Sequence, residues 1–370
     1  MVYRSRILCC CAGLALAVRA QAADRTVFVG TYTAGTQSKG IYAFHFDSKT
    51  GKLSGGTLAA ESLNPSFLTV HPTGRYLYAV NETREGAISS FVIDHEKLIP
   101  QNSVSSRGAD PCHVAVDHTG QWVFVANYTG GSVAAFQILQ HGSLEEASAF
   151  DQHSGSSVNG QRQEGPHAHV VVPSPDNHFL LVADLGTDRV LVYHFDPSNG
   201  RLAPEESAQL TPGSGPRHLV FSKNRKFVYV LDELAATIDL FHWNFRNGSL
   251  APIGSVPMDP AGSAGEKSGA EIVIDPKGRF LYASNRGDDS ISIFRVHGGQ
   301  LVPAGHVASG GKTPRSFVMD RSGKFLLAAN QNSGSIVEFK IDPTTGNLTP
   351  TGEQIAIPSP VSVVFAGLGG

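Results

Sequence analysis

The feature that most constrains this chain is a seven-residue phrase that recurs along it. The phrase begins with a basic or polar residue, continues with aromatic and aliphatic residues, and closes with Asn or Asp. It occurs at 75–81, 121–127, 178–184, 226–232, 279–285 and 324–330, with a variant at 25–31. Successive closing residues are 50, 46, 57, 48, 53 and 45 positions apart. Periods of about 40 to 50 residues are typical of β-propeller blades, so the sequence predicts a seven-bladed β-propeller.

Each repeat unit also has a common internal order. Short runs of β-branched and aromatic residues alternate with Gly, Pro, Asn and Asp, which predicts four antiparallel strands per blade and almost no helix. The first unit lacks its first strand, whereas residues 360–366 supply that strand at the C-terminus. We therefore expect one all-β domain, 23–370, closed by pairing of this strand with the one beginning at Thr26. A linear solenoid is the alternative that the split blade disfavours.

Two aligned positions are small or apolar in most blades but charged in others, which indicates a use besides packing. The first follows the residue that opens the innermost strand and reads Ser66, Cys112, His169, Arg217, Ala270, Arg315 and Val361. The second follows the closing residue of the phrase and reads Tyr32, Glu82, Tyr128, Leu185, Glu233, Arg286 and Gln331. Innermost strands line the channel of a propeller, so each set is expected to form a ring near one mouth.

The charged members of these rings form the candidate site. The set expected to share one concavity is His169, Arg217, Glu233, Arg286 and Arg315, with Glu82 and Gln331 as further substrate contacts. For any single member, solvated turn chemistry is the alternative.

Other residues give weaker signals. His113 and His218 occupy the next aligned position and are expected on the opposite face of the strand, where a packed or turn-bonded histidine is the simpler interpretation. His167 lies two residues before His169 and is a candidate to support it. The insertion 150–165, rich in Ser, Gly and Gln, is interpreted as a mobile surface loop that could cover one channel mouth.

No sequence motif indicates a metal site or a serine nucleophile. The sequence lacks G-x-S-x-G, H-E-x-x-H and an EF-hand loop. Asp117, Asp275 and Asp320 recur in the turns of the repeat and are expected to accept local backbone hydrogen bonds. We therefore predict no metal and no cofactor.

The first 22 residues have the order of a secretory signal peptide. Arg4 and Arg6 precede an apolar run, 7–18, which is too short for a transmembrane helix, and the A-x-A pattern at 20–22 is a cleavage site. Three of the four cysteines lie in this segment, so the mature chain keeps only Cys112 and forms no internal disulfide. Lipid anchoring through a cysteine of this segment stays open.

The mature chain is mildly acidic. Removal of residues 1–22 leaves 26 Lys and Arg residues against 32 Asp and Glu residues, a net charge of −6. This charge disfavours nucleic-acid binding. We expect a periplasmic or secreted monomer that has no membrane span and binds a small molecule.

Several of the candidate residues belong to short sequence motifs. These are Gly-Pro-Arg-His at 215–218, Asp-Glu-Leu at 232–234, Asn-Arg at 285–286 and Pro-Arg at 314–315, together with His169 at the start of its strand. At these residues, and along nearly the whole mature chain, the sequence resembles the 6-phosphogluconolactonase family of seven-bladed propellers, which includes fungal carboxymuconate lactonizing enzymes. The resemblance places His169, Arg217, Glu233 and Arg286 on the family's proposed active-site positions. Arg315 is also shared with bacterial members.

The resemblance implies hydrolysis of a sugar lactone and a role in carbohydrate metabolism, although an exported chain departs from the family's cytosolic setting. Glu233 or His169 would act as the general base, Arg217 and Arg286 would contact the oxyanion and a carboxylate, and Arg315 would hold a distal anion. A lactone-forming cycloisomerase that uses the same site stays open, as does a non-catalytic exported scaffold.

Overall fold

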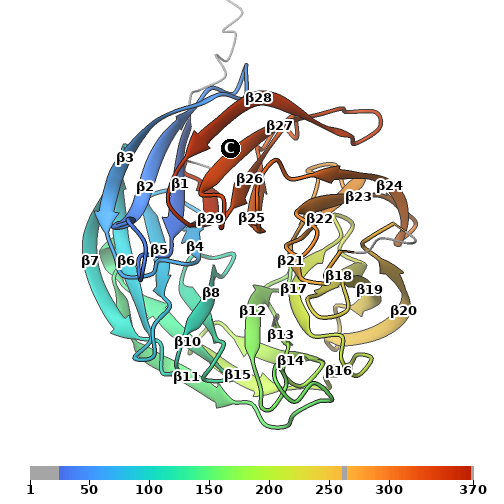
Figure 1. The fold of residues 1–370 in the computed structure, drawn as a ribbon. Coiled ribbons are helices and arrows are strands. Elements are labelled where there is room, and N and C mark those ends of the chain that lie inside the picture. Colours follow the sequence, from blue (N-terminus) through green and yellow to red (C-terminus); the bar gives the residue numbers. More distant parts are fainter. Residues whose placement is uncertain (1–24, 261–264, 368–370) are drawn as a thin grey trace, which may run out of the picture.

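The computed structural model describes residues 25–260 and 265–367, so the expected signal peptide lies outside the described residues. Seven sheets stand around a central axis, as Figure 1 shows. Among the described residues the only helical segment is a short 3-10 turn, η1 (Gln140–Gly142). None of them belongs to a helix with the length and hydropathy needed to cross a bilayer. The predicted seven-bladed all-β propeller is confirmed.

The strands are assigned to blades in chain order. Blade 1 contains β1 (Arg25–Thr31), β2 (Gly40–Phe46) and β3 (Leu53–Glu61); blade 2 contains β4 (Leu68–Val70), β5 (Tyr76–Asn81), β6 (Ala87–Asp94) and β7 (Lys97–Ser105). Blade 3 contains β8 (Pro111–Val116), β9 (Trp122–Asn127), β10 (Ser132–Ile138) and β11 (Leu144–Gln152). Blade 4 contains β12 (Ala168–Pro173), β13 (Phe179–Asp184), β14 (Arg189–Asp196), β15 (Arg201–Pro204) and the short β16 (Ala208–Gln209), which also pairs with β14.

The last three blades follow the same plan. Blade 5 contains β17 (Pro216–Phe221), β18 (Phe227–Asp232), β19 (Thr237–Asn244) and β20 (Ser249–Pro257). Blade 6 contains β21 (Gly269–Ile274), β22 (Phe280–Asn285), β23 (Ser290–His297) and β24 (Gln300–Ala308). Blade 7 contains β25 (Pro314–Met319), β26 (Phe325–Asn330), β27 (Ser335–Ile341) and β28 (Leu348–Ala356), and β29 (Pro360–Phe365) crosses to blade 1.

The ring closes through the two ends of the described chain. β29 pairs with β1 in antiparallel register, with Val29 opposite Val363, and so completes blade 1 in the order β29-β1-β2-β3. The predicted closure is confirmed. Because β1 is paired on both sides, its backbone groups form no free sheet edge.

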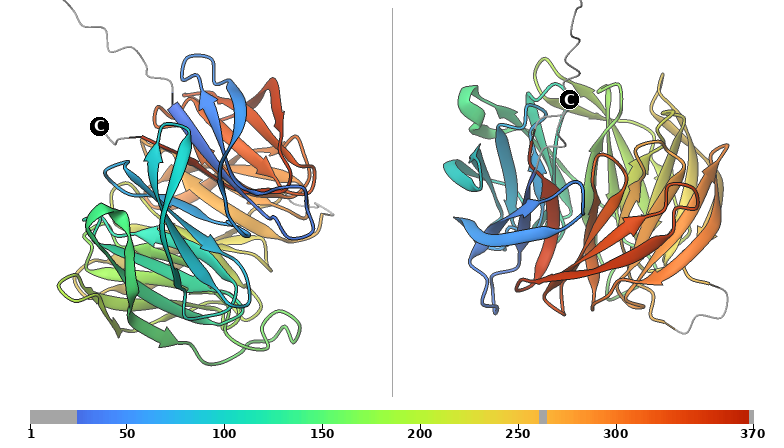
Figure 2. Two further views of the ribbon diagram at one scale, coloured as in Figure 1. Left: turned by 90° about the vertical axis from the view of Figure 1, so that its left-hand side faces the viewer. Right: turned by 90° about the horizontal axis from the view of Figure 1, so that it is seen from above.

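The apolar core lies between the blades. Seven clusters of buried residues each draw on two adjacent sheets, and together they run around the whole ring. Figure 2 shows the blades from two sides, packed sheet against sheet. In the turns of the repeat, Asp117 and Asp320 accept backbone N–H groups four and five residues ahead at 2.7 to 2.8 Å, and Asp275 makes the same contacts. The predicted local role of these aspartates is confirmed.

The innermost strands carry a feature that the repeat did not reveal. In β17 the register shifts between Pro216, opposite Asp232, and His218, opposite Leu231, so Arg217 is an extra, unpaired residue. The same shift leaves Cys112, His169 and Arg315 unpaired in β8, β12 and β25. Such a β-bulge locally breaks the alternation of side chains between the two faces of a strand. The bulges therefore decide which side chains face the channel.

Candidate active site

A cavity of about 310 Å³ opens at one mouth of the channel. Its lining residues are Tyr32, Glu82, Cys112, Tyr128, Arg162, His169, Glu233, Arg286 and Arg315. All of them except Arg162 occupy one of the two aligned positions that the sequence singled out. Residues far apart in the chain meet here because each blade contributes a residue near the start of its first strand, just after the end of its second strand, or at both places.

A larger cavity of about 590 Å³ lies among turns between strands, including 275–279 and 322–325. Its lining includes Lys49, Asp275, Lys277 and Lys324, and it contains no histidine. Asp275 is already engaged by the backbone of its own turn. Of these two cavities we take the smaller one as the candidate functional site, because it brings carboxylates, an imidazole and several guanidiniums together.

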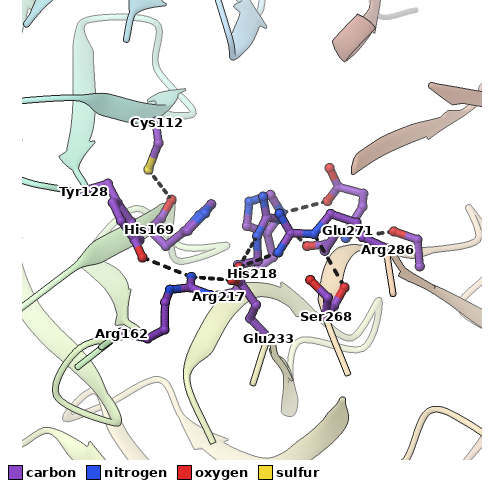
Figure 3. A network of polar contacts seen from close by, with 12 residues as sticks. Cys112, Tyr128, Arg162, His169, Arg217, His218, Glu233, Ser268, Glu271 and Arg286 are labelled. Atoms are coloured by element: carbon purple, nitrogen blue, oxygen red, sulfur yellow. Dashed lines mark hydrogen bonds and ion pairs between the residues drawn. The ribbon is translucent and has the colours of Figure 1, made fainter. Parts of the chain in front are cut away.

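Glu233 is the electrostatic centre of the site, as Figure 3 shows. Its Oε1 lies 2.5 Å from Nη2 of Arg162, and its Oε2 lies 3.0 Å from Nε of Arg217 and 2.8 Å from Nη2 of Arg286. The carboxylate side chain is only 4% exposed. Burial alone would raise the pKa of Glu233, but the three guanidiniums outweigh it and lower this pKa to about 2. Glu233 is therefore a counterion for the arginines and a weak base.

His169 lies beside this cluster. Its side chain is buried, and its Nδ1 has no hydrogen-bond partner among the described residues. The ring packs edge-on against Tyr128 and His218, with centroid distances of 5.6 and 5.3 Å. Burial, followed by the charge of Arg217, lowers the pKa of His169 well below its ordinary value. The imidazole is therefore neutral at neutral pH and keeps a free ring nitrogen.

The opposite wall of the cavity holds a second charged group. The hydroxyl of Tyr32 donates to the carboxylate of Glu82, with both oxygens at 2.9 Å. The guanidinium of Arg315 lies over the Tyr32 ring, 5.3 Å from its centroid. Arg315 thus presents a cation from a fixed position, held by an aromatic face with a carboxylate nearby.

A second polar layer lies deeper in the channel. A small cavity of about 10 Å³ is lined there by residues that include Arg217, His218 and Glu271. Nδ1 of His218 lies 2.9 Å from Oε1 of Glu271, and the rings of His218 and His113 are 5.5 Å apart. Burial raises the pKa of Glu271 to about 7. His218 lines the same small cavity as Arg217, so the prediction that these two side chains lie on opposite faces is wrong, and the bulge at Arg217 accounts for it. His113 and His218 are both buried and packed, as the sequence indicated.

The insertion 150–165 contributes the site residue that the sequence reasoning missed. The loop is not loosely attached: Gln163 is fully buried and its Nε2 donates to Oδ1 of Asp188 at 2.8 Å, while Oγ of Ser157 donates to Oδ2 of the same carboxylate at 2.5 Å. Asp188 also accepts the backbone N–H groups of Gly213 and Gly215. This network holds Arg162 over the channel mouth, where the insertion covers part of the site as expected, although as an anchored segment.

Three further predicted residues take different places. Gln331 is not among the lining residues of either channel cavity. His167 stacks on Tyr128 with a centroid distance of 4.5 Å and an interplanar angle of 15°, so it supports the wall of the cavity from behind. Arg217 lies in the deeper layer and reaches the site through Glu233.

Among the described residues, one group of possible metal ligands occurs outside the site. Asp259, Asp288 and His306 each offer an atom within 4.8 Å of the others. Nε2 of His306 already lies 2.9 Å from Asp288, and Asn285 donates to both oxygens of Asp259. Each of the three side chains therefore has a polar partner within the protein and needs no bound ion.

Comparisons with known proteins identify the family of the chain. The family described as Lactonase, 7-bladed beta-propeller matches residues 26–365. A 6-phosphogluconolactonase of Bacillus subtilis is 34% identical in an alignment of 343 residues that covers 91% of this chain and 97% of that protein. A 6-phosphogluconolactonase of Formosa agariphila is 34% identical in an alignment of 350 residues that covers 90% of this chain and 96% of that protein. A solved structure is that of a periplasmic gluconolactonase of Pseudomonas aeruginosa, which is 33% identical in sequence and has a TM-score of 0.88, with 94% of this chain and 100% of that one covered.

Proposed function

Because this chain belongs to the lactonase family of seven-bladed β-propellers, we propose that it hydrolyses a sugar lactone in the cavity at the channel mouth. The observation that carries the proposal is the convergence of one neutral imidazole and several guanidiniums on a single cavity of about 310 Å³. A lactone is a cyclic ester, so its hydrolysis needs a base for water and cations for the oxyanion. The protein is accordingly a carboxylic ester hydrolase.

His169 is the general base in this proposal. Glu233 shares its charge among three arginines and has a pKa of about 2, so it takes a proton from water poorly. His169 is neutral and lines the cavity, and its buried Nδ1 has no hydrogen-bond partner among the described residues. An anionic substrate would cancel part of the charge of the arginines, which raises the pKa of His169 toward neutral in the complex. The proton that His169 takes from water then passes to the ring oxygen of the lactone as the ester bond breaks.

The arginines stabilise negative charge. Arg286 lines the cavity and holds its guanidinium 2.8 Å from Glu233, which leaves its other N–H groups for the oxyanion that forms during attack. Arg217 lies deeper, where burial and the neighbouring guanidiniums lower its pKa to about 10, so it remains charged at neutral pH. Both keep their positions through Glu233, whose role is to fix the cationic groups before the substrate arrives.

The substrate is an acidic sugar lactone. Arg162, Arg286 and Arg315 line the cavity with Glu82 and Glu233, which is an excess of one positive charge, and Arg217 adds a further guanidinium beside Glu233. This excess favours a lactone with a phosphate or carboxylate over a neutral one. Two relatives are named 6-phosphogluconolactonase and one periplasmic gluconolactonase, so phosphorylated and plain gluconolactones are the first compounds to compare. Such a reaction belongs to carbohydrate metabolism.

The place of action is also part of the proposal. The order of residues 1–22 is that of a signal peptide, and the structural relative from Pseudomonas aeruginosa is named periplasmic. We place the mature chain in the periplasm or outside the cell. We propose that it acts there as a monomer, because one chain supplies both the base and the cations of the proposed reaction and no residue of a second subunit is needed.

The direct test is a screen of the purified mature protein against sugar and aliphatic lactones, with proton release followed and spontaneous hydrolysis subtracted. Turnover of a sugar lactone well above the spontaneous rate supports the proposal. A protein that binds lactones without turnover would be a scaffold, and one that forms a lactone from an unsaturated acid would be a cycloisomerase.

Replacing Arg315 with alanine is expected to raise KM by roughly 10-fold with little change in kcat. Arg315 is fixed on the Tyr32 ring at the wall opposite Glu233, so it contacts the polar tail of the substrate equally in the ground and transition states. Steady-state kinetics on the best substrate of the screen measure the change. A fall in kcat with KM unchanged would place Arg315 at the reacting atoms instead.

Replacing Glu233 with glutamine is expected to lower the free energy of unfolding by roughly 3 kcal/mol, because three guanidiniums lose their shared counterion. Chemical denaturation at pH 7 measures the loss. Added phosphate should restore more stability to this variant than to wild type, since an anion replaces the lost carboxylate. The wild-type contribution exists above the ordinary pKa of 4.5 and is lost as the pH falls toward 2. Equal stability of both proteins at pH 7 would contradict the counterion role.

A further inference from the structure

The backbone of Arg162 is held firmly, whereas its side chain is not. The N–H groups of Arg162 and Gln163 both donate to Asn159, and the buried amide of Gln163 ties the loop to Leu185 and Asp188. The side chain of Arg162 is nevertheless 42% exposed and reaches across the cavity mouth to Glu233 and the Tyr128 hydroxyl. A fixed backbone with an exposed guanidinium allows the charged group to change partners without a movement of the loop.

The three arginines on Glu233 differ in how tightly they are held. Arg217 is 3% exposed and also donates to the backbone carbonyl of Ala270. Arg286 is 15% exposed and also contacts the carbonyl of Ser268. Arg162 alone comes from a loop without a counterpart in the other blades, and it occupies the second carboxylate oxygen, Oε1. If Arg162 leaves, Glu233 still keeps two guanidiniums on Oε2.

We propose that Arg162 is a specificity-determining residue that exchanges Glu233 for the anionic group of an incoming lactone. This inference rests on the proposed lactone hydrolysis and adds a residue and a substrate feature to it. The exchange replaces one charge-assisted contact with another, so Arg162 need not give up its favourable pairing when the substrate binds. A neutral lactone offers no such partner and leaves Arg162 on Glu233. The enzyme thereby selects lactones that carry a phosphate or a carboxylate.

The test compares two lactones with the same ring, 6-phospho-D-glucono-1,5-lactone and D-glucono-1,5-lactone, on wild type, Arg162→Gln and Arg162→Lys. Glutamine removes the charge, and lysine keeps the charge but loses the paired donors of the guanidinium. Arg201→Gln is the matched control, because Arg201 is an exposed arginine on the outer strand β15. Binding of the products 6-phosphogluconate and gluconate, measured by calorimetry, provides a second reading that does not depend on turnover.

For Arg162→Gln we expect kcat/KM on the phosphorylated lactone to fall roughly 10- to 100-fold, the range for one charge-assisted contact, with kcat/KM on the neutral lactone within about threefold of wild type. The kcat/KM of Arg162→Lys on the phosphorylated lactone should lie between the values for wild type and Arg162→Gln. The values for Arg201→Gln should match those of wild type. The preference for 6-phosphogluconate over gluconate should shrink by the same factor. Equal losses on both lactones, or an unchanged product preference, would overturn the exchange. If wild type hydrolyses neither lactone, the proposed function fails, and product binding alone decides the role of Arg162.

Discussion

A protein that lacks residues 360–370 is expected to lose cooperative folding. This deletion removes β29, which is the inner neighbour of β1 in blade 1. Val363 belongs to the apolar cluster between blades 7 and 1, and Ala366 to the cluster between blades 1 and 2, so two of the seven interfaces lose buried residues. Each fully buried aliphatic side chain contributes about 1.5 to 3 kcal/mol, and the whole fold is stable by only about 5 to 15 kcal/mol.

Thermal unfolding followed by circular dichroism, together with size-exclusion chromatography, tests this expectation. The truncated chain should show a broad transition or none, and it should aggregate because β1 becomes an unpaired edge. The matched control is a chain that lacks only 368–370 and keeps β29 whole. A protein without 360–370 that stays monodisperse and melts like the full chain would show that β29 is dispensable for closure.

The fold was predictable because a propeller repeats one set of local rules seven times. The phrase that closes at Asn81 or Asn285 marks the second strand of its blade, and the Asp of each turn caps the backbone of the same turn. These interactions are local in sequence, so the pattern of residues reveals them directly. Even the long-range closure of the ring was visible, because one strand was missing at one end and present at the other.

The aligned repeat also predicted the cavity, but it could not predict the direction of each side chain. A β-bulge depends on the register between two strands, and no residue type in the repeat announces it. Arg217 and His218 therefore both face the channel, where strict alternation would have separated them. Gln331 shares the aligned position of Glu233 but does not line the cavity, and the aligned position alone could not predict that difference.

The sequence could predict neither the role of Arg162 nor which residue is the base, for two different reasons. The insertion that carries Arg162 has no counterpart in the other blades, so no aligned position could mark it as unusual. His169 and Glu233 were equal candidates for the base because each can accept a proton. Their surroundings separate them, since three arginines converge on Glu233 and none pairs with His169 among the described residues. This difference in surroundings depends on contacts between blades 4, 5 and 6 and the insertion 150–165, which are distant in sequence.

Replacing His169 with asparagine is expected to lower kcat for lactone hydrolysis by about 10²-fold or more, since it removes the proposed general base. Asparagine is smaller and polar, and His169 makes no side-chain hydrogen bond through Nδ1 among the described residues, so the fold should survive. Steady-state kinetics on a sugar lactone measure the loss. The matched control is His178→Asn, because His178 is a histidine in an exposed turn and should leave kcat unchanged.

The pH dependence of kcat/KM distinguishes His169 from Glu233 as the base. The pKa of His169 in the free protein lies well below 6.5, so kcat/KM should be constant near neutral pH and fall only as acid protonates the imidazole. Replacement of His169 should remove this acid limb together with the activity. With Glu233 as the base, the limb would instead lie near its pKa of about 2, and it would persist in the His169→Asn variant. A His169→Asn variant that keeps both full kcat and the wild-type pH profile would therefore exclude His169 as the base. The role would then return to Glu233, which would first have to lose its arginine partners.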